Sequence, residues 1–154
     1  MLILFLISLI IFISYVSFIW IKYGVLSSIS ESYYILPEKL QILFTLFCFG
    51  CGFPIVIVGV PLTPLMFFAG ASMCFIGAAS SFKRSFTHDV HYISAILAII
   101  FAQLSILSFS LWPLCLIFII GSILIKLILK KNTFWWVEIL AFITIYIALV
   151  IKLF

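Results

Sequence analysis

The chain opens with MLILFLISLIIFISYVSFIWIK (Met1–Lys22), a run in which no residue before Lys22 is charged. A hydrocarbon core about 30 Å thick is crossed by a helix of about 20 apolar residues. A signal peptide would have a basic start, a shorter apolar stretch and a cleavage site of small residues, and this run has none of these. We therefore predict an uncleaved membrane-spanning helix over residues 1–21.

The composition of the whole chain agrees with this beginning. Of the 154 residues, 68% are hydrophobic and only 8% are charged. A typical soluble domain has about 25% charged residues, so this chain has too few to cover the surface of a water-soluble globule. The same numbers exclude disordered, fibrous, disulfide-framework and nucleic-acid-binding classes. The sequence predicts a polytopic membrane protein without a nucleic-acid partner.

Five further apolar runs follow, and short polar or proline-containing segments separate them. Pro61 and Pro64 favour a turn between the second and third runs, because proline lacks the N–H that a helix interior needs. The segment 110–113, which ends in Pro113, separates the fourth run from the fifth in the same way. We predict an all-α integral membrane bundle of six transmembrane helices with short loops, in one domain, with spans over residues 1–21, 41–60, 65–81, 90–109, 113–129 and 134–154.

The basic residues are concentrated in alternate connections. Seven basic residues lie in the connections after the first, third and fifth spans or at the end of the fifth span: Lys22, Lys39, Lys83, Arg84, Lys126, Lys130 and Lys131. If there are six spans, these three connections share one side of the membrane and only Lys152 lies opposite. The positive-inside rule makes that side cytoplasmic. We therefore expect the loops after spans one, three and five in the cytoplasm and both termini outside, in a bacterial inner membrane.

Small residues and tryptophans indicate how the spans pack. Inside lipid, helices associate where small residues let their backbones approach. Gly70 and Gly77 lie on nearly the same face of the third span, so we expect that span at the centre of the bundle. Gly50 and Gly52 of the second span are expected to form a matching contact or a kink before Pro54. The four tryptophans fall near the predicted interfaces, as an aromatic belt requires: Trp20, Trp112, Trp135 and Trp136.

The first polar loop carries candidate ligand-binding residues. Ser28 and Glu31 have capping-box spacing, which predicts a short helix from near Ile29 to before Pro37. One interpretation is an interfacial helix with its tyrosines at the depth of the lipid headgroups. The other is that Ser30, Glu31 and Tyr33 fold into the cytoplasmic mouth of the bundle and bind a polar ligand or headgroup.

Glu138 lies about one turn inside the sixth span. A carboxylate within a membrane is costly unless it is paired or neutralised, and it is a functional candidate for that reason. Near the cytoplasmic end it can form an ion pair with Lys126, Lys130, Lys83 or Arg84, or it can belong to a ligand site. Gln103, deeper in the fourth span, is expected to form an interhelical hydrogen bond.

His88, Asp89 and His91 open the fourth span and are candidate metal ligands. Histidines three residues apart share a helix face, and two imidazoles with a carboxylate can bind zinc, iron or copper. Alternatively, Asp89 caps the helix start, or the cluster binds a polar ligand or a proton. Cofactors are otherwise unknown from the sequence. Cys48 and Cys51 form a C-x-x-C pair inside the second span, where buried thiols pack as small apolar groups.

Two resemblances bear on these residues. Residues 21–24, 30–34, 65–77 and 91–92 resemble small polytopic membrane proteins of bacteria and their phages, which have no assigned activity. The chain also resembles, more faintly, the ceramidase-type membrane hydrolases, which use Ser, Asp and three His around zinc. That resemblance implies Ser30, Asp89, His88 and His91 as counterparts, and the third His of that family is absent.

Function is expected on the cytoplasmic face. The leading hypothesis is a non-enzymatic membrane protein that binds a lipid headgroup, a small solute or a partner subunit through the polar residues Ser30, Glu31, Tyr33, Lys83, Arg84 and Glu138. The cations there would attract anionic headgroups, and the chain could form a homo-oligomer. The alternatives are a compact metal-dependent membrane hydrolase and a small oligomeric permease.

Overall fold

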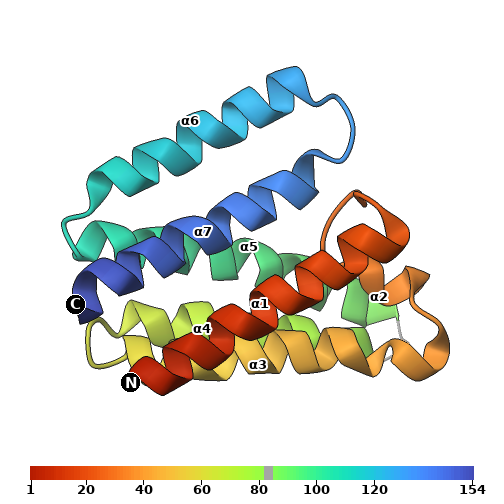
Figure 1. Ribbon diagram of the computed structural model, residues 1–154, viewed down its shortest axis with the longest axis horizontal. Helices are drawn as coiled ribbons and strands as arrows, with labels where there is room; N and C mark the ends of the chain where they lie inside the picture. Colours follow the sequence, from red (N-terminus) through yellow and green to blue (C-terminus); the bar gives the residue numbers. More distant parts are fainter. Residues whose placement is uncertain (82–84) are drawn as a thin grey trace.

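The computed structural model describes residues 1–81 and 85–154, with side chains for residues 1–79 and 89–154. The described residues are helical and turn segments without a β-strand. In chain order the elements are α1 (Leu2–Tyr23), α2 (Ser32–Ile35), the 3₁₀ turn η1 (Glu38–Leu40), α3 (Ile42–Gly59), α4 (Leu65–Ser81), α5 (Ser85–Ser108), α6 (Trp112–Ile128) and α7 (Thr133–Leu153) (Figure 1).

The long helices follow the predicted spans closely, with one correction. Five of them begin and end within two residues of prediction, but α5 begins at Ser85 rather than Val90. The predicted spans leave residues 82–89 as a polar loop, and this prediction is wrong for residues 85–89, which belong to α5. The segment Ser85–Val90 contains neither glycine nor proline, so nothing in it stops a helix. Asp89 consequently lies inside α5, and the prediction that it caps the helix start is wrong.

In the part of the chain that the structure describes, four helical segments are long and apolar enough to cross a membrane: Leu2–Tyr23, Glu38–Gly59, Asp89–Ser108 and Thr133–Leu153. The other two long helices, α4 and α6, have 17 residues each and are shorter than these. Many large apolar side chains point away from the protein, among them Ile21 of α1 and Ile128 of α6, which are 87% and 73% exposed. A helical bundle with an apolar outer surface is what a membrane environment requires.

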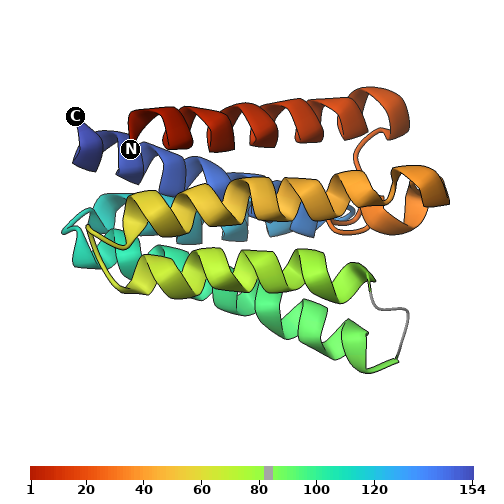
Figure 2. The ribbon, with the colours of Figure 1, turned by 90° about the horizontal axis from the view of Figure 1, so that it is seen from below.

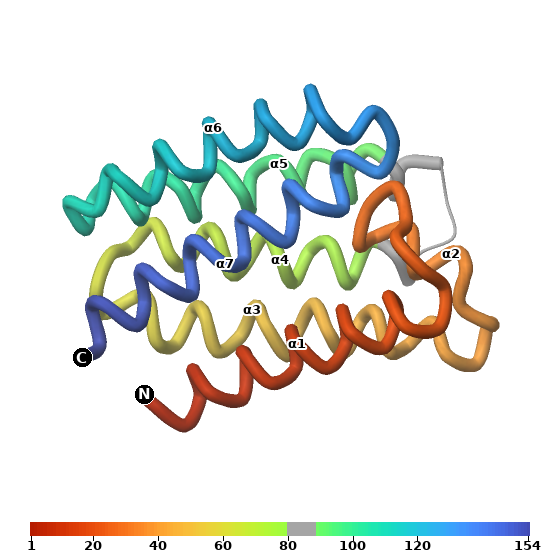
Figure 3. Tube along the Cα trace, turned by 45° about the horizontal axis from the view of Figure 1, so that its top comes forward, coloured from red at the N-terminus to blue at the C-terminus, as the bar shows by residue number. Residues whose placement is uncertain are grey.

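The long helices lie side by side, and their ends alternate. The amino and carboxyl termini are at one end of the bundle, and α2 with the α6–α7 connection is at the other (Figure 1). α4 packs between α3 and α5 (Figure 2). α1 and α6 form opposite edges (Figure 3), and Cys115 is the one buried residue of α6 among those described. The polar loop after α1 thus lies at the end remote from both termini.

The contact of α3 with α4 depends on glycine, as predicted for Gly52 but not for Gly50, which faces Ile11 of α1. A Cβ atom on Gly70 would lie 2.6 Å from the Gly52 carbonyl oxygen, and one on Gly52 would lie 2.8 Å from that of Gly70. No other residue type allows the two backbones to approach this closely. A Cβ on Gly77 would lie 2.6 Å from the Cβ of Cys48, so the same face of α4 is in contact farther along.

Polar side chains connect the helices in the interior. The hydroxyls of Ser8 in α1 and Tyr146 in α7 share a hydrogen bond of 2.7 Å. The Gln103 side chain of α5 donates to the Thr144 hydroxyl of α7 at 3.2 Å, which confirms the predicted interhelical bond. Cys48 and Cys51 are free and buried, as expected of thiols that pack as apolar groups. The two hydrogen bonds join α1 and α5 to α7.

Candidate functional site

The loop between α1 and α3 is organised by the predicted capping pair. The Ser28 hydroxyl accepts a hydrogen bond from the Glu31 N–H at 3.1 Å, and the Glu31 carboxylate accepts one from the Ser27 N–H at 2.6 Å. These two bonds stabilise the turn that precedes α2. A turn follows Ser28, and α2 then ends at Ile35, before Pro37. A short helix forms before Pro37 as predicted, but it begins at Ser32 rather than near Ile29, and residues 29–31 form a turn.

This loop packs into the protein rather than lying beside it. Ile29 and Leu36 are each 3% exposed, and Tyr33 is buried against the Phe44 ring with a centroid distance of 6.0 Å. The Ser32 hydroxyl shares a hydrogen bond of 2.6 Å with the hydroxyl of Tyr15 in α1. Residues 25–36, which we call the cap, therefore close one end of the bundle.

Three hydrogen bonds attach the cap to the start of α7. The Asn132 side chain donates to the Val25 carbonyl at 2.8 Å, and the Trp135 backbone N–H donates to the Ser27 carbonyl at 3.0 Å. The Ile29 N–H donates to the Glu138 carboxylate at 2.6 Å. Asn132 adopts φ 57°, a left-handed conformation that asparagine tolerates, and this turn directs α7 toward the cap.

Trp135 corrects the expectation that all four tryptophans form an interfacial belt. Its side chain is 0% exposed and packs inside the protein, whereas Trp20 and Trp112 are 52% and 60% exposed. Trp135 is in the first turn of α7, next to the backbone bond to Ser27. A tryptophan near the end of a span can lie at the interface or inside the protein, and the sequence does not distinguish the two positions.

Behind the cap lies a pocket that the long helices α3, α4, α5 and α7 enclose. Its volume is about 90 Å³, several times the 10–15 Å³ or so that one water molecule needs. The residues that line it are Ile29, Ser30, Phe44, Phe47, Cys48, Ile55, Ala69, Met73, Ile76, Ala95, Ala98, Ile99, Ala102, Glu138, Ala141, Phe142 and Ile145.

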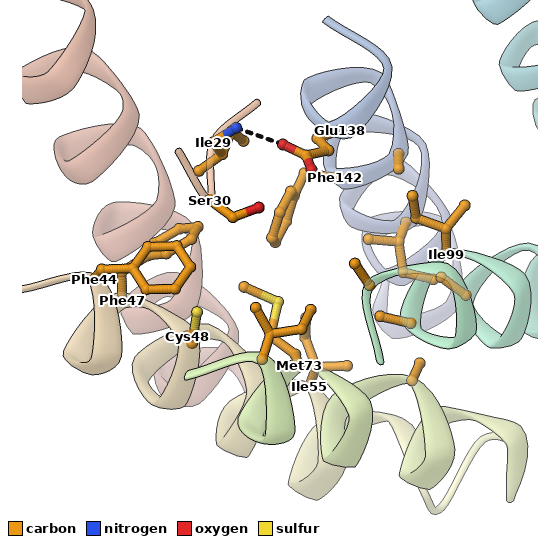
Figure 4. A pocket seen from close by; sticks show the side chains of 17 residues that line it. Ile29, Ser30, Phe44, Phe47, Cys48, Ile55, Met73, Ile99, Glu138 and Phe142 are labelled. Carbon is orange, nitrogen blue, oxygen red and sulfur yellow. Dashed lines mark hydrogen bonds between the residues drawn. The ribbon is translucent and has the colours of Figure 1, made fainter. Parts of the chain in front are cut away.

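The pocket is polar at one end only. Ser30 and Glu138 line its capped end, and Figure 4 shows their oxygen atoms near the Ile29–Glu138 hydrogen bond. The remaining walls are aliphatic, aromatic or thiol groups, such as Ile55 and Met73 on the far side in the same view. A shape of this kind, an apolar wall with a few polar groups at one place, is typical of a small-molecule site.

The residues that line the pocket are less deeply buried on α5 and α7 than on α3 and α4. The lining residues of α3 and α4 are all buried, whereas Ala95, Ala98 and Ile99 of α5 and Glu138 and Phe142 of α7 are only half-buried. The more exposed part of the pocket lining therefore lies on α5 and α7.

The structure separates the sequence-predicted candidates into groups. Ser30 and Glu138 meet at the pocket. Glu31 and Tyr33 belong to the cap, where Glu31 binds the Ser27 N–H and Tyr33 packs on Phe44. The ion pair expected between Glu138 and Lys126 or Lys130 is absent from the described residues, since the carboxylate bonds to the Ile29 N–H.

The candidates at the start of α5 are less informative. Asp89 is exposed, and His91 is half-buried with its ring 6.1 Å from that of Phe44. Lys83, Arg84 and the His88 side chain lie outside the described residues. Within the described part of the chain no three His, Cys, Asp or Glu side chains form a group that could hold a metal ion.

The apolar wall of the pocket is what sequence reasoning missed. Ala95, Ala98 and Ala102 follow one another at helical spacing on α5, and Glu138, Phe142 and Ile145 do so on α7. Spacing of three or four residues places side chains on one helix face. Such a stripe is a signal in the sequence, but it does not reveal which helix it faces or that a space remains between them.

Comparisons with known proteins assign no family to the chain. No protein-family model matches it, and neither a curated protein nor a solved structure is similar to it.

Proposed function

We propose that this chain is an integral membrane protein that binds a membrane amphiphile, with the alkyl chain in the α3–α4–α5–α7 pocket and the polar group beside Ser30 and Glu138. The observation that carries the proposal is the pocket itself, whose walls are apolar except for these two residues at its capped end. This corresponds to the lipid-headgroup hypothesis from the sequence, with the binding site placed inside the bundle.

The proposal takes all six long helices as membrane spans. α4 and α6 have 17 residues each, which is the lower limit of about 17 for a transmembrane helix. Both lie alongside the four longer candidate spans (Figure 3). The cap and its basic neighbours then face the cytoplasm and both termini face outward, as the positive-inside rule requires. Lys83 and Arg84 would contact anionic headgroups of the surrounding bilayer.

The chemistry of the walls favours an alkyl chain over a water-soluble ligand. A polar solute would leave its polar groups without partners against Phe47, Met73 and Ile76, and an unpartnered polar group in an apolar site costs several kcal/mol. An alkyl chain gains about 0.8 kcal/mol for each buried CH₂ group. The half-buried wall between α5 and α7 would face lipid, so the ligand can enter from the bilayer.

The length of the pocket also suits a chain. On α7 its lining runs from Glu138 to Ile145, and on α5 from Ala95 to Ala102. At 1.5 Å of rise per residue, each run covers about 10 Å along the helix axis. An extended alkyl chain can lie along this direction with its polar end at Ser30.

Photocrosslinking of the purified full-length protein tests the proposal. The probe is a long-chain alcohol with a photoreactive diazirine on its alkyl chain, and we expect crosslinked peptides from α5 and α7 that include pocket residues. Ala98→Phe fills the pocket and should reduce labelling more than about tenfold, because the chain loses several buried CH₂ groups. Ile100→Phe, on the exposed side of the same helix at 46% exposure, is the matched control.

Two results would overturn the proposal. One is labelling confined to lipid-facing residues such as Ile100. The other is equal labelling of Ala98→Phe and the wild type when both elute as folded protein in gel filtration.

A further inference from the structure

We infer that the polar group of the bound amphiphile is a primary ammonium, held by the Glu138 carboxylate and the Ser30 hydroxyl. This inference rests on the proposed function and specifies the ligand's chemistry. It starts from the polar end of the pocket, where the lining offers one carboxylate and one hydroxyl and no cation among the described residues.

In its ionised form Glu138 has a negative charge that its protein partner, a neutral N–H group, does not balance. Its carboxylate accepts one hydrogen bond from the neutral Ile29 N–H. A carboxylate removed from water is stabilised by a nearby cation together with further donors. The described basic residues near this end all have exposed side chains, and none of them forms an ion pair with Glu138: Lys22, Lys39, Lys126, Lys130 and Lys131. A cationic ligand supplies the missing charge.

Hydrogen-bonding capacity separates a primary ammonium from other head groups. An ammonium has three N–H donors and no acceptor. At this site the carboxylate and the Ser30 hydroxyl oxygen can each accept one of them. An alcohol has one donor and no charge, a quaternary ammonium has the charge without a donor, and a carboxylate head would be repelled by Glu138. Each lacks the positive charge, the three N–H donors or both, and can serve as a control.

An ammonium can belong to two kinds of amphiphile. In a long-chain amine the nitrogen is attached to the alkyl chain itself. In an ethanolamine lipid a phosphate and a glycerol unit lie between the nitrogen and the chain. Dodecylamine and lysophosphatidylethanolamine represent the two sources. The source is the one whose binding advantage is lost when Glu138 is replaced by glutamine.

Competition against the photoreactive alcohol tests the inference with the full-length protein in nanodiscs. The competitors have equal chain length: dodecylamine, dodecanol, dodecyltrimethylammonium and dodecanoate. We expect half-displacement by dodecylamine at a concentration at least about tenfold below that of the other three, since truncating one partner of a buried charge pair commonly costs more than this factor.

Glu138→Gln is the decisive variant, because the amide oxygen can still accept from Ile29 N–H while the charge is removed. We expect it to abolish the advantage of dodecylamine over dodecanol, measured as the ratio of their half-displacement concentrations in the same variant. Glu31→Gln is the matched control. It removes a carboxylate of the cap that binds Ser27 N–H and is not part of the pocket lining, so the advantage should persist.

Failure of this inference can be distinguished from failure of the proposed function. If the alcohol probe labels the pocket and Ala98→Phe prevents it, the lipid site stands. In that case two comparisons decide the ammonium inference: dodecylamine against dodecanol, and lysophosphatidylethanolamine against a lysophospholipid without an amine. The inference is overturned if the amine binds no better than its partner in both comparisons. An amine advantage that survives in Glu138→Gln overturns it as well. If the probe never labels the pocket, the proposed function itself is overturned.

Discussion

The Glu138 carboxylate accepts a hydrogen bond of 2.6 Å from the backbone N–H of Ile29, a residue 109 positions earlier in the chain. Glu138 belongs to α7 and Ile29 to the cap, so this bond connects the last long helix to the first loop. It also holds Ile29 and Ser30 at the capped end of the pocket (Figure 4). One carboxylate thereby contributes both to the fold and to the polar end of the site.

The first prediction concerns this bond. Glu138→Ala should leave the Ile29 N–H without its acceptor and destabilise the docked cap, at a cost of about 1–3 kcal/mol for an unsatisfied buried donor. Amide hydrogen exchange should become faster across the cap, while Glu138→Gln, which keeps an acceptor, should stay close to the wild type. Unchanged exchange in Glu138→Ala would show that apolar packing alone holds the cap.

The second prediction concerns the α3–α4 contact. Gly70→Ala should lower stability by about 1–3 kcal/mol, because the added methyl group meets backbone that cannot move aside. Its nearest backbone atom would be the Gly52 carbonyl oxygen at 2.6 Å. Thermal unfolding in detergent measures the effect.

Gly50→Ala is the matched control for that experiment. The added Cβ would meet the Cδ1 end of the flexible Ile11 side chain, at 2.7 Å, with no backbone atom among its nearest contacts. Alanine also has the better helix propensity. The loss of stability should therefore be smaller than in Gly70→Ala, and equal losses would contradict the close backbone contact.

The third prediction concerns the hydroxyl pair of Ser8 and Tyr146, whose oxygens are 2.7 Å apart. A double-mutant cycle with Ser8→Ala and Tyr146→Phe should give a coupling free energy of about 0.5–1.5 kcal/mol, because each single substitution leaves the other hydroxyl without this partner. Phenylalanine keeps the ring that packs on Phe12. A coupling free energy of zero would mean that the pair contributes nothing to the association of α1 with α7.

The fourth prediction concerns topology. A reporter that is active only outside the cytoplasm should work when fused after Phe154 and fail when fused at Lys131, because α7 lies between the two positions and the basic loop stays inside. A reporter active only in the cytoplasm, such as a fluorescent protein that folds there, should give the reverse pattern. The same activity at both positions would exclude α7 as a span.

Much of the fold could be predicted from the residues alone. Long apolar runs, prolines at the turns and the glycines of α3 and α4 each act locally, so the helix ranges and the Gly52–Gly70 contact followed from them. The start of α5 could not be predicted in this way, because a polar segment is compatible with either a loop or a helix. The burial of Trp135 could not be predicted either, since a tryptophan near the end of a span packs equally well at an interface or under a folded loop.

The candidate site was predictable only in part. Glu138 stood out because a carboxylate in an apolar run is costly, and Ser30 because it lies in the one long polar loop. Their meeting could not be foreseen, because a backbone N–H such as that of Ile29 has no signature in the sequence. The apolar wall was likewise hidden, since an alanine that lines a cavity and one that packs against a neighbour look the same.

The sequence by itself determined that this chain is an apolar helical bundle, where its helices run and how its charges are distributed, because these properties depend on neighbouring residues and on the cost of charge in an apolar medium. Only the tertiary structure decided that the cap folds inward, that Glu138 binds Ile29 and that a pocket remains behind them. Those features depend on contacts between residues far apart in the chain, and on the space that packed side chains leave unfilled.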